Sequence, residues 1–454
     1  MKYIKNMMRF PTLIATLVFS LGNTAISAQN VEESAEHKQR MEWFDNAKLG
    51  IFIHWGIYAV NGISESWSFY NNYIPYSEYM QQAKGFTAKH YNPQEWVKLI
   101  KESGAQYTVI TTKHHDGVAL WDTQAGTLST KKSTPAKRDL ITPFVKAVRD
   151  SGLKLGLYYS LLDWSHPDYP NWTKTTTRYK ISDDTARWQR FCDFNFAQMK
   201  ELNNQFKPDL YWFDGDWEQT ALDWRAADIV SMLRKDNPNV IFNSRIQGYG
   251  DYATPEQGVP VVRPKEPHWE LCMTMNDSWG WQPHDKNFKS PYMLLRTFVD
   301  CLSNGGNMLL DIGPREDGTI PQEEIDILKE FGRWITKHKE AIYETRAGIP
   351  NEHFQGYTTL NPSGDILYLY LPYRPNGVVE IKGLVNKVNR VWVVGNGTML
   401  NYKVYNKNYW SEVPGNLYID VPDEVLDPQI TVLAVLLDGP AKLYRGAGQV
   451  ISVN

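Results

Sequence analysis

Hydrophobic and polar positions between residues 48 and 343 form two alternating kinds of segment. Short apolar runs, rich in β-branched and aromatic residues, are separated by longer stretches in which apolar positions recur every three or four residues. The short runs predict seven strands, at 48–54, 106–113, 153–160, 210–213, 239–243, 269–274 and 306–311. The longer stretches predict helices at 93–103, 142–151, 183–206, 221–235, 291–302 and 323–343.

Strands that alternate with helices over this length predict parallel βαβ units. Seven strands before residue 320 favour a (β/α)8-like barrel of the TIM type over a doubly wound sheet. No glycine-rich dinucleotide or phosphate motif follows any of these strands, which also counts against a nucleotide-binding fold. No eighth strand is evident, so an irregular barrel stays open. We assign residues 29–345 to this barrel.

The pattern changes after about residue 346. Short strands are predicted at 366–371, 378–382, 388–394 and 430–437, separated by turns rich in Gly, Pro and Asn. This spacing is typical of a β-sandwich, which we assign to residues 346–454. The segment has no cluster of chemically reactive residues, so we expect it to pack on the barrel or to face carbohydrate.

Residues 1–28 have the pattern of a secretory signal peptide. Basic residues precede an apolar run at 13–21 that is too short to cross a membrane, and small residues follow up to Ala28. We therefore predict cleavage near Ala28 and export, either to a periplasm or out of the cell, with no membrane span in the mature chain. Residues 29–48 are predicted to be a polar lead-in.

Composition narrows the range of partners. The chain has 48 Lys and Arg against 51 Asp and Glu, a net charge of -3, which argues against a nucleic-acid partner. The 17 Trp and 26 Tyr suit sugar rings as well as an ordinary core. Three cysteines at no metal-ligand spacing are predicted to be free thiols. The sequence indicates no cofactor and leaves the oligomeric state open.

Polar and aromatic residues gather where predicted strands end. They are His54, His114, His115, Tyr159, Trp212, Asp214 and Arg245. In a parallel barrel the carboxyl ends of the strands meet around one pocket, so we expect these residues to lie together. The Asp214-Gly215 pair by itself could be a solvated turn. The same arrangement at several strand ends favours a functional site.

Three kinds of chemistry use residues of these types. Three histidines and an aspartate could hold zinc, but His114 and His115 are adjacent and would point to opposite faces of a strand. A Ser-His-Asp hydrolase would need a Gly-x-Ser-x-Gly turn, which is absent. Paired carboxylates fit glycoside hydrolysis, with Asp214 as the nucleophile. The residues alone leave four acids open: Glu256, Glu270, Asp216 and Glu65.

Five motifs occur in order between about residues 43 and 343. They are Gly-Ile-Phe-Ile-His-Trp-Gly at 50–56, Thr-Lys-His-His-Asp-Gly at 112–117, Leu-Tyr-Tyr-Ser at 157–160 with Asp-Trp at 163–164, Trp-Phe-Asp at 212–214, and Gly-Gly-Asn-Met-Leu-Leu-Asp-Ile-Gly-Pro at 305–314. This set resembles the α-L-fucosidases of glycoside hydrolase family 29. The C-terminal sandwich also fits that family.

The resemblance implies a retaining exo-α-L-fucosidase acting on fucosylated oligosaccharides or glycoconjugates, with no metal at its site. Asp214 matches the nucleophile of the family. The segment 251–256 resembles the loop that carries the acid/base, which implies Glu256, with Glu270 as the second choice. The sugar contacts implied are His54, His114, His115, Tyr159, Trp212 and Arg245, with Trp67 flanking the sugar and Glu65 near it. A Glu-Trp pair common in the family is here interrupted, as Glu65-Ser66-Trp67.

Two further expectations concern the acid and the alternatives. A retaining pair places its carboxyl groups about 5–5.5 Å apart, and the acid Glu256 is expected in a partly apolar site. A non-catalytic fucose-binding protein would lack one of the two carboxylates, and both Asp214 and Glu256 are present. An α-galactosidase-like enzyme on the same fold also stays open, because L-fucose and D-galactose present related stereochemistry.

Overall fold

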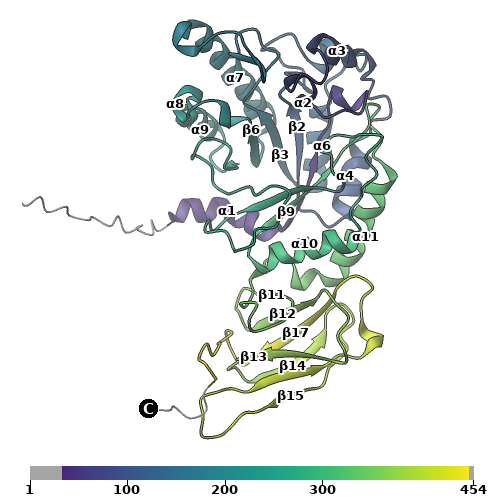
Figure 1. Ribbon diagram of the computed structural model, residues 1–454, viewed down its shortest axis with the longest axis vertical. Helices are drawn as coiled ribbons and strands as arrows, with labels where there is room; N and C mark the ends of the chain where they lie inside the picture. The colour runs from purple at the N-terminus through teal and green to yellow at the C-terminus, as the bar shows by residue number, and fades with distance from the viewer. Residues whose placement is uncertain (1–32, 449–454) are drawn as a thin grey trace, which may run out of the picture.

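The computed structural model describes residues 33–448, so the predicted signal peptide at 1–28 lies outside the described residues. A barrel of strands and helices forms one end of the molecule and a pair of antiparallel sheets forms the other (Figure 1). The chain passes once from the first part to the second, through helix α11 (Gln322–His338). The predicted fold class is therefore confirmed.

All seven predicted barrel strands are present. They are β1 (Leu49–Ile53), β2 (Tyr107–Lys113), β3 (Lys154–Ser160), β6 (Leu210–Asp214), β7 (Ile241–Phe242), β8 (Glu270–Thr274) and β9 (Asn307–Ile312). They form one curled sheet in the order β7-β6-β3-β2-β1-β9-β8, and every neighbouring pair is parallel. A small antiparallel pair, β4 (Asn171–Thr173) with β5 (Thr176–Thr177), lies outside this sheet.

The gap between β7 and β8 is filled by an irregular segment, residues 251–257. Its backbone joins both edges of the sheet, since Asp251 N donates to Phe242 O (2.7 Å) and Gln257 N donates to Cys272 O (2.9 Å). Isolated parallel bridges continue the pairing, with Glu256 opposite Cys272. Pro255 has no N–H to donate, which prevents a regular ladder here. This segment takes the place of the eighth strand that the sequence did not reveal.

Helices cover the outside of the sheet. They are α4 (Pro93–Glu102), α6 (Ile141–Ser151), α7 (Thr185–Phe206), α8 (Ala221–Trp224), α9 (Ala226–Asp236), α10 (Pro291–Ser303) and α11. The side chain of Asn92 caps α4, and Gly152 ends α6 at φ 78°. The predicted helix at 221–235 is split in two because Arg225 adopts a left-handed φ of 53°.

Shorter elements lie in the loops between these helices and strands. They are α2 (Trp67–Tyr70), α3 (Tyr76–Gln81), α5 (Thr130–Ser133) and the 3-10 turns η1 (Ile57–Ala59), η2 (Gln82–Gly85), η3 (Ile181–Asp183), η4 (Asp216–Glu218), η5 (Lys339–Ala341) and η6 (Asp423–Val425). Two of them, α2 and η4, follow directly on residues of the predicted site. The loops at the carboxyl ends of the strands are therefore partly ordered by local helical turns.

The prediction of a polar lead-in at 29–48 is wrong for residues 35–47, where helix α1 (Ala35–Ala47) closes the amino-terminal end of the barrel (Figure 1). Its buried residues are Met41, Phe44 and Ala47, which recur every three positions and give only a narrow apolar stripe. The ring of Phe44 packs inside the barrel against Tyr252, with ring centroids 4.4 Å apart. A stripe this narrow is easily missed among polar neighbours.

The barrel strands are buried on both faces, and successive side chains alternate between them. Phe52, Tyr158 and Trp212 point into the barrel, where they join a small apolar cluster. Their neighbours Tyr159 and Phe213 point outward into the larger core beneath the helices. Tyr158 and Trp212 are paired in register on β3 and β6, so they stand side by side in the barrel wall.

The C-terminal part consists of two antiparallel sheets. One has five strands in the order β10 (Arg346–Ala347), β11 (Tyr357–Leu360), β12 (Ile366–Leu371), β17 (Thr431–Leu437), β14 (Val388–Val393). The other has the order β13 (Val378–Lys382), β16 (Asn416–Asp420), β15 (Tyr402–Tyr405). A separate apolar core lies between them. On its other face the larger sheet packs against the barrel, where Trp334 Nε1 of α11 donates to Ile430 O (2.8 Å).

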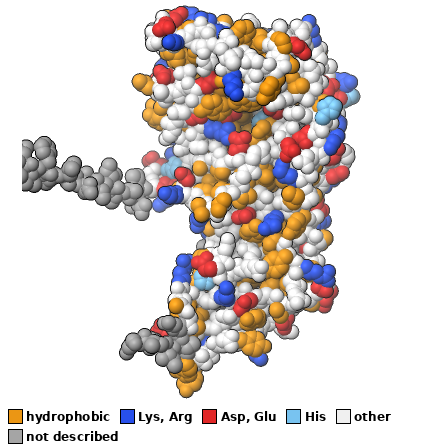
Figure 2. Space-filling model, in the orientation of Figure 1, with side chains coloured by type: hydrophobic (Ala, Val, Ile, Leu, Met, Phe, Trp, Pro, Cys, Tyr) orange, Lys and Arg blue, Asp and Glu red, His pale blue; other side chains and the backbone are white. Residues whose placement is uncertain are grey.

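The distribution of surface charge and the state of the cysteines agree with what the sequence predicts. Charged side chains of both signs are scattered over the face seen in Figure 2. Within residues 33–448, no helix has an apolar stretch of the length needed to cross a bilayer. Cys192, Cys272 and Cys301 are free and buried, as predicted.

Candidate active site

A cavity of about 180 Å³ opens where the carboxyl ends of the barrel strands meet. It is smaller than the pockets of about 300–1,000 Å³ that hold drug-sized ligands, so it suits a single small ring. The residues that line it are Phe52, His54, Glu65, Trp67, His114, Tyr158, Trp212, Asp214, Trp217, Arg245, Glu256 and Trp279. Most of the predicted site residues are among them.

Asp214 ends strand β6 and lies in the wall of this cavity with only 8% of its surface exposed. Two donors hold its carboxylate, and a third residue lies close to it. Tyr158 Oη donates to Oδ2 (2.9 Å), Arg245 Nη1 donates to Oδ1 (2.8 Å), and His115 Nε2 lies 3.5 Å from Oδ2. The carboxylate is thus fixed in orientation by donors on two sides, while its strand position aims it into the pocket.

Glu256 lies on the irregular segment 251–257 and reaches the same cavity from the opposite edge of the sheet. Its side chain is 41% exposed, and its Oε2 accepts from Arg245 Nη2 (2.6 Å). Glu256 is therefore open to solvent on one side, while its other side faces the cavity and the aromatic residues that line it. Tyr252, which precedes it on the same segment, packs inside the barrel.

Arg245 joins the two carboxylates. Its two terminal nitrogens contact Asp214 and Glu256 separately, and its guanidinium lies over the ring of Trp212, 4.5 Å from the ring centroid. The adjacent carboxylates raise the pKa of the guanidinium further, although burial alone would lower it. Arg245 is therefore a fixed positive charge between two acids.

His54 and His114 line the cavity as neutral bases. Burial is the largest cause that lowers the pKa of each ring well below its usual value. His54 Nδ1 contacts Asp311 Oδ1 (2.7 Å), and His114 Nδ1 contacts Ser66 Oγ (2.6 Å). With Nδ1 occupied in each ring, the Nε2 atoms are the ones left to meet hydroxyl groups of a ligand.

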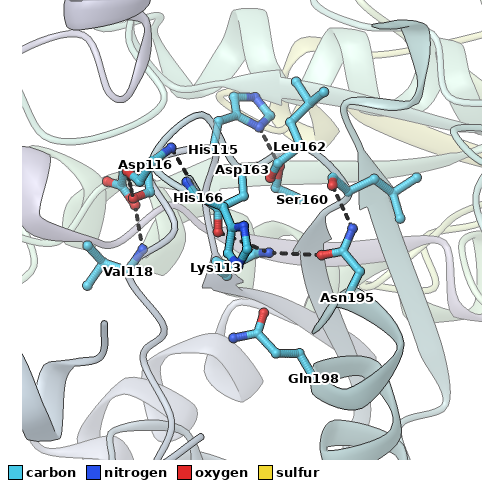
Figure 3. A network of polar contacts seen from close by, with 12 residues as sticks. Lys113, His115, Asp116, Val118, Ser160, Leu162, Asp163, His166, Asn195 and Gln198 are labelled. Atoms are coloured by element: carbon cyan, nitrogen blue, oxygen red, sulfur yellow. Dashed lines mark hydrogen bonds and ion pairs between the residues drawn. The ribbon is translucent and has the colours of Figure 1, made fainter. Parts of the chain in front are cut away.

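His115 does not line the cavity, but it stands directly behind Asp214. Its Nδ1 contacts Ser160 Oγ (2.6 Å), and that hydroxyl donates to Leu162 O (2.8 Å), so Nδ1 carries the ring proton (Figure 3). Burial lowers the pKa of the ring to about 3. Its Nε2 therefore bears a lone pair and has no hydrogen-bond partner within the described protein.

The expectation that His114 and His115 point to opposite faces is wrong. Strand β2 ends at Lys113, so the alternation of a strand no longer applies to the two histidines that follow. Their ring centroids lie 4.2 Å apart, on the same side as Asp214. The argument from adjacency against a shared role therefore fails, although the two rings use their nitrogens in different contacts.

Glu65 is a third carboxylate in the cavity wall. It is 4% exposed, and burial raises its pKa to about 7. Its Oε1 accepts from Gly280 N (2.7 Å). A Cβ at Gly280 would lie 2.6 Å from the ring of Tyr58, so only glycine lets this N–H approach so closely. Glu65 reaches the cavity even though Ser66 separates it from Trp67.

Tryptophans form much of the remaining wall. Trp67 and Trp217 stack nearly parallel, with ring centroids 6.1 Å apart and an interplanar angle of 14°. Trp279 lies on the other side, over His54 at 4.9 Å. Flat aromatic faces with few rotatable bonds are well suited to the apolar face of a sugar ring.

Tyr159 was predicted to contact the ligand, and the structure places it elsewhere. Its hydroxyl lies outside the barrel wall, within 2.9 Å of Asn195 Oδ1 and of Gln198 Oε1 on α7. Lys113, whose Nζ donates to Asn195 Oδ1 (3.3 Å), belongs to the same buried polar network (Figure 3). Tyr158, the residue before it, points into the cavity. Both are tyrosines in an apolar run, so residue type gave no means of choosing between them.

Glu270 does not line the cavity either. It lies under the pocket floor with no exposed surface, accepting from Trp212 Nε1 (3.0 Å) and from the hydroxyl of Tyr107. Burial raises its pKa to about 7. Asp216, another acid candidate, accepts from Gln247 N (2.9 Å) beside the pocket. Of the four acid candidates, only Glu256 and Glu65 reach the cavity.

Sequence reasoning missed Phe52, Tyr158, Trp217 and Trp279 as lining residues. Phe52 could have been found by counting back two positions from His54, since inward positions alternate along a strand. Tyr158 could not, because β3 is apolar on both faces. Trp217 follows Asp214 by three residues, on turn η4. Trp279 lies on a long loop, where no periodicity applies.

The geometry supports acid–base chemistry on a small polyhydroxylated ligand. Neutral imidazoles and a buried carboxyl group can hold hydroxyl groups, tryptophans can cover a ring face, and two carboxylates share one guanidinium. Comparison with known proteins names the family. The model of the alpha-L-fucosidase family matches residues 19–340.

The chain belongs to the alpha-L-fucosidase family. A tissue alpha-L-fucosidase from Mus musculus is 30% identical over 383 residues, which cover 77% of this chain and 82% of that protein. A plasma alpha-L-fucosidase from Rattus norvegicus is 32% identical over 352 residues, which cover 71% of this chain and 74% of that protein. The chain is thus an alpha-L-fucosidase of the glycoside hydrolases, and its substrates carry fucose.

Solved fucosidases share the whole architecture. Alpha-L-fucosidase isoenzyme 1 from Paenibacillus thiaminolyticus superposes with a TM-score of 0.80 at 33% identity, covering 89% of this chain and 100% of that one. A family 29 fucosidase from Bacteroides thetaiotaomicron, trapped as a covalent intermediate with 2-fluoro-fucosyl fluoride in a glutamate-to-glutamine mutant, has a TM-score of 0.76 at 27% identity. It covers 88% of this chain and 96% of its own.

Proposed function

We propose that this fucosidase is a retaining exo-enzyme in which Asp214 is the nucleophile and Glu256 the acid/base. The observation that carries the proposal is the position of Arg245, which donates to both carboxylates at once, at 2.8 Å and 2.6 Å. One guanidinium can touch two carboxylates only if they are close neighbours. A retaining mechanism needs such closeness, with about 5–5.5 Å between the carboxyl groups.

The two carboxylates then act in sequence. A carboxylate oxygen of Asp214 attacks the anomeric carbon while the glycosidic bond breaks, and Glu256 gives its proton to the departing oxygen. The product of this step is a fucosyl ester of Asp214. Glu256 then removes a proton from a water molecule whose oxygen attacks the anomeric carbon, which releases fucose and restores Asp214.

The surroundings of each carboxylate suit its proposed task. Asp214 is buried and held by Tyr158 and Arg245, as a nucleophile that must attack along one line requires. Glu256 is 41% exposed, where it can meet both a leaving group and a water molecule. The covalent intermediate trapped in the Bacteroides thetaiotaomicron fucosidase supports a double displacement for this chain as well.

The size of the cavity supports removal of one terminal sugar at a time. At about 180 Å³ it holds one ring, and the rest of a fucosylated oligosaccharide or glycoconjugate lies outside, past Glu256. His54, His114 and Glu65 are the proposed partners of the sugar hydroxyls. Trp67, Trp217 and Trp279 are proposed to cover its apolar faces.

The first test is release of 4-nitrophenol from the aryl α-L-fucoside, with the α-D-galactoside and the β-D-fucoside as controls. We expect turnover of the α-L-fucoside alone, with α-L-fucose as the first product seen by NMR. An inverted first product would contradict the retaining mechanism. Equal turnover of the galactoside would favour an α-galactosidase-like specificity. Binding of fucosylated oligosaccharides without any turnover would favour a fucose-binding protein.

The second test assigns the acid/base. Glu256→Ala is expected to lose about 10²–10⁴-fold in kcat on substrates with poor leaving groups, because nothing protonates the departing oxygen. With an aryl fucoside whose leaving group needs no proton, azide should restore much of the turnover by attacking the fucosyl ester and forming an α-fucosyl azide. Glu270→Ala is the matched control, since Glu270 is buried beneath the floor. Azide rescue in Glu270→Ala without rescue in Glu256→Ala would move the acid role to Glu270.

We also propose that the chain is exported. The support is the basic start, the apolar run at 13–21 and the small residues that end at Ala28. Expression of the full chain in a bacterial host, followed by N-terminal sequencing of the protein from the periplasm and the medium, tests this. A chain that starts after Ala28 is expected there, whereas an uncleaved chain confined to the cytoplasm would contradict export.

A further inference from the structure

A second group of ligand-type side chains lies at the opposite end of the barrel from the cavity. Glu33 and His37 stand at the start of helix α1, and His268 lies just before β8. Oε1 of Glu33 contacts Nδ1 of His37 and lies 2.9 Å from Nε2 of His268. The three donor atoms all lie within 4.8 Å of one another. None of these residues takes part in the site described above.

Each of the two imidazoles also contacts a second carboxylate, through the ring nitrogen that does not face Glu33. His268 Nδ1 lies 2.7 Å from Asp45 Oδ1, and His37 Nε2 lies 3.1 Å from Asp251 Oδ1. With a metal ion between the rings and Glu33, the nitrogen that faces Asp45 or Asp251 would carry the ring proton, and the other nitrogen would give its lone pair to the metal. Histidines that bind metals are oriented in this way, by a carboxylate on the second nitrogen.

Three electron-rich atoms therefore converge on one point, two imidazole nitrogens and one carboxylate oxygen. A single divalent cation at that point could accept a lone pair from each of the three atoms.

We propose that Glu33, His37 and His268 bind a zinc ion, through Glu33 Oε1, His37 Nδ1 and His268 Nε2, with water as the fourth ligand. Two nitrogens and one oxygen are a common ligand set for Zn²⁺, which binds them at about 2.0–2.2 Å. The three side chains need only separate slightly to admit the ion. Spacing along the chain does not reveal this site, because His268 lies far from the other two ligands.

The position of this zinc site gives it a structural task. It ties the first turn of α1 to the start of β8, at the end of the barrel that α1 closes. Through Asp251 it also touches the start of the segment 251–257, whose far end carries Glu256. Zinc is thus expected to stabilise the closed barrel and to take no part in the chemistry at the other end.

The experiment uses the full mature chain without a histidine tag. The protein is dialysed against a chelator and then titrated with Zn²⁺ alone, and bound metal and Tm are measured. We expect one zinc per chain and a rise in Tm of at least about 2–4 °C. Failure of the protein to retain zinc would overturn the proposal and leave a cluster of protonated histidines and carboxylates.

Substitutions of the proposed ligands test where the zinc ion binds. His37→Gln and His268→Gln should each abolish stoichiometric zinc and the Tm rise, and Asp45→Asn should weaken zinc binding about 10–100-fold by releasing His268. His90→Gln is the control, since His90 is exposed and faces only Asp317. If His268→Gln does not fold, zinc binding by His37→Gln tests the proposal, because His37 lies on the partly exposed face of α1. Unchanged zinc binding in the His37 variant would overturn the proposal.

Discussion

The barrel wall has a regular arc and an irregular one, and they supply different kinds of side chain to the same cavity. The regular arc, from β9 through β1, β2 and β3 to β6, places Asp214, His54 and His114 in buried positions. The irregular arc, from β7 through residues 251–257 to β8, places Arg245 and Glu256, and Glu256 is 41% exposed. A continuous ladder of strand hydrogen bonds fixes the side chains that it carries. The segment that pairs through isolated bridges leaves Glu256 open to solvent.

The difference matches the two tasks of the proposed mechanism. The group that forms the covalent bond comes from the arc that is most firmly held, and the group that exchanges protons comes from the arc that faces water. Arg245 connects the arcs. Four predictions test this division, in order of decreasing effect.

The largest effect is expected for Asp214→Ala. Without its carboxylate no fucosyl ester can form, and turnover should fall by more than about 10⁴-fold while Tm changes by only a few degrees. Turnover of the aryl fucoside and a thermal melt measure both. A variant that kept near-native rates would show that the buried acid is not the nucleophile.

Arg245→Lys is expected to have the next largest effect. A lysine carries the charge but cannot donate to Asp214 and Glu256 from two fixed nitrogens, so kcat should fall about 10²–10³-fold. Arg149→Lys, on an exposed arginine paired with Asp209, is the control. Equal activity of Arg245→Lys and Arg149→Lys would mean that turnover does not depend on the contacts of Arg245 with the two carboxylates.

Tyr158→Phe and Tyr159→Phe form a matched pair on one strand. Loss of the Tyr158 hydroxyl removes a donor to Asp214, and kcat/KM should fall about 10–100-fold. Loss of the Tyr159 hydroxyl leaves Gln198 Oε1 without its donor and Asn195 Oδ1 with Lys113 alone, which should cost about 1–3 kcal/mol of stability and leave kcat/KM within about twofold. The reverse outcome would mean that the inward and outward faces are misassigned.

A smaller effect on activity than that of Tyr158→Phe is expected for Glu270→Gln, whose effect on stability depends on pH. In the folded protein the pKa of Glu270 is about 7, above its unfolded value of 4.5. Folding therefore favours its proton, and this contribution to stability is full below pH 4.5 and is lost as the pH rises through 7. Glutamine has no such loss, so the variant should gain up to about 3 kcal/mol over the parent.

Thermal melts of both proteins at pH 4.5 and pH 8 measure this difference. Other buried acids, such as Glu65, titrate alike in the two proteins, so the difference isolates Glu270. The activity of Glu270→Gln should stay within about tenfold, because the amide oxygen still accepts from Trp212. A difference in melting that does not change with pH would contradict the assignment of the titration to this side chain.

The strands of both arcs could be predicted from the sequence, and the segment 251–257 between β7 and β8 could not. Apolar runs revealed all seven strands, and Asp214 and His54 followed from their strand ends. The segment 251–257 contains Pro255 and pairs through isolated bridges, so it has no strand periodicity to detect. Tyr158 and Tyr159 could not be told apart because β3 is apolar on both faces.

The contact between barrel and sandwich bears on how the molecule unfolds. Helix α11 buries Trp334 against β17, and the hydroxyl of Tyr370 on β12 donates to the Ala341 carbonyl, so one continuous apolar core crosses the boundary. Neither the barrel nor the sandwich can unfold without exposing apolar surface of the other. Heating should therefore melt barrel and sandwich in a single calorimetric transition, and a chain ended at residue 345 would expose α10 and α11 and aggregate.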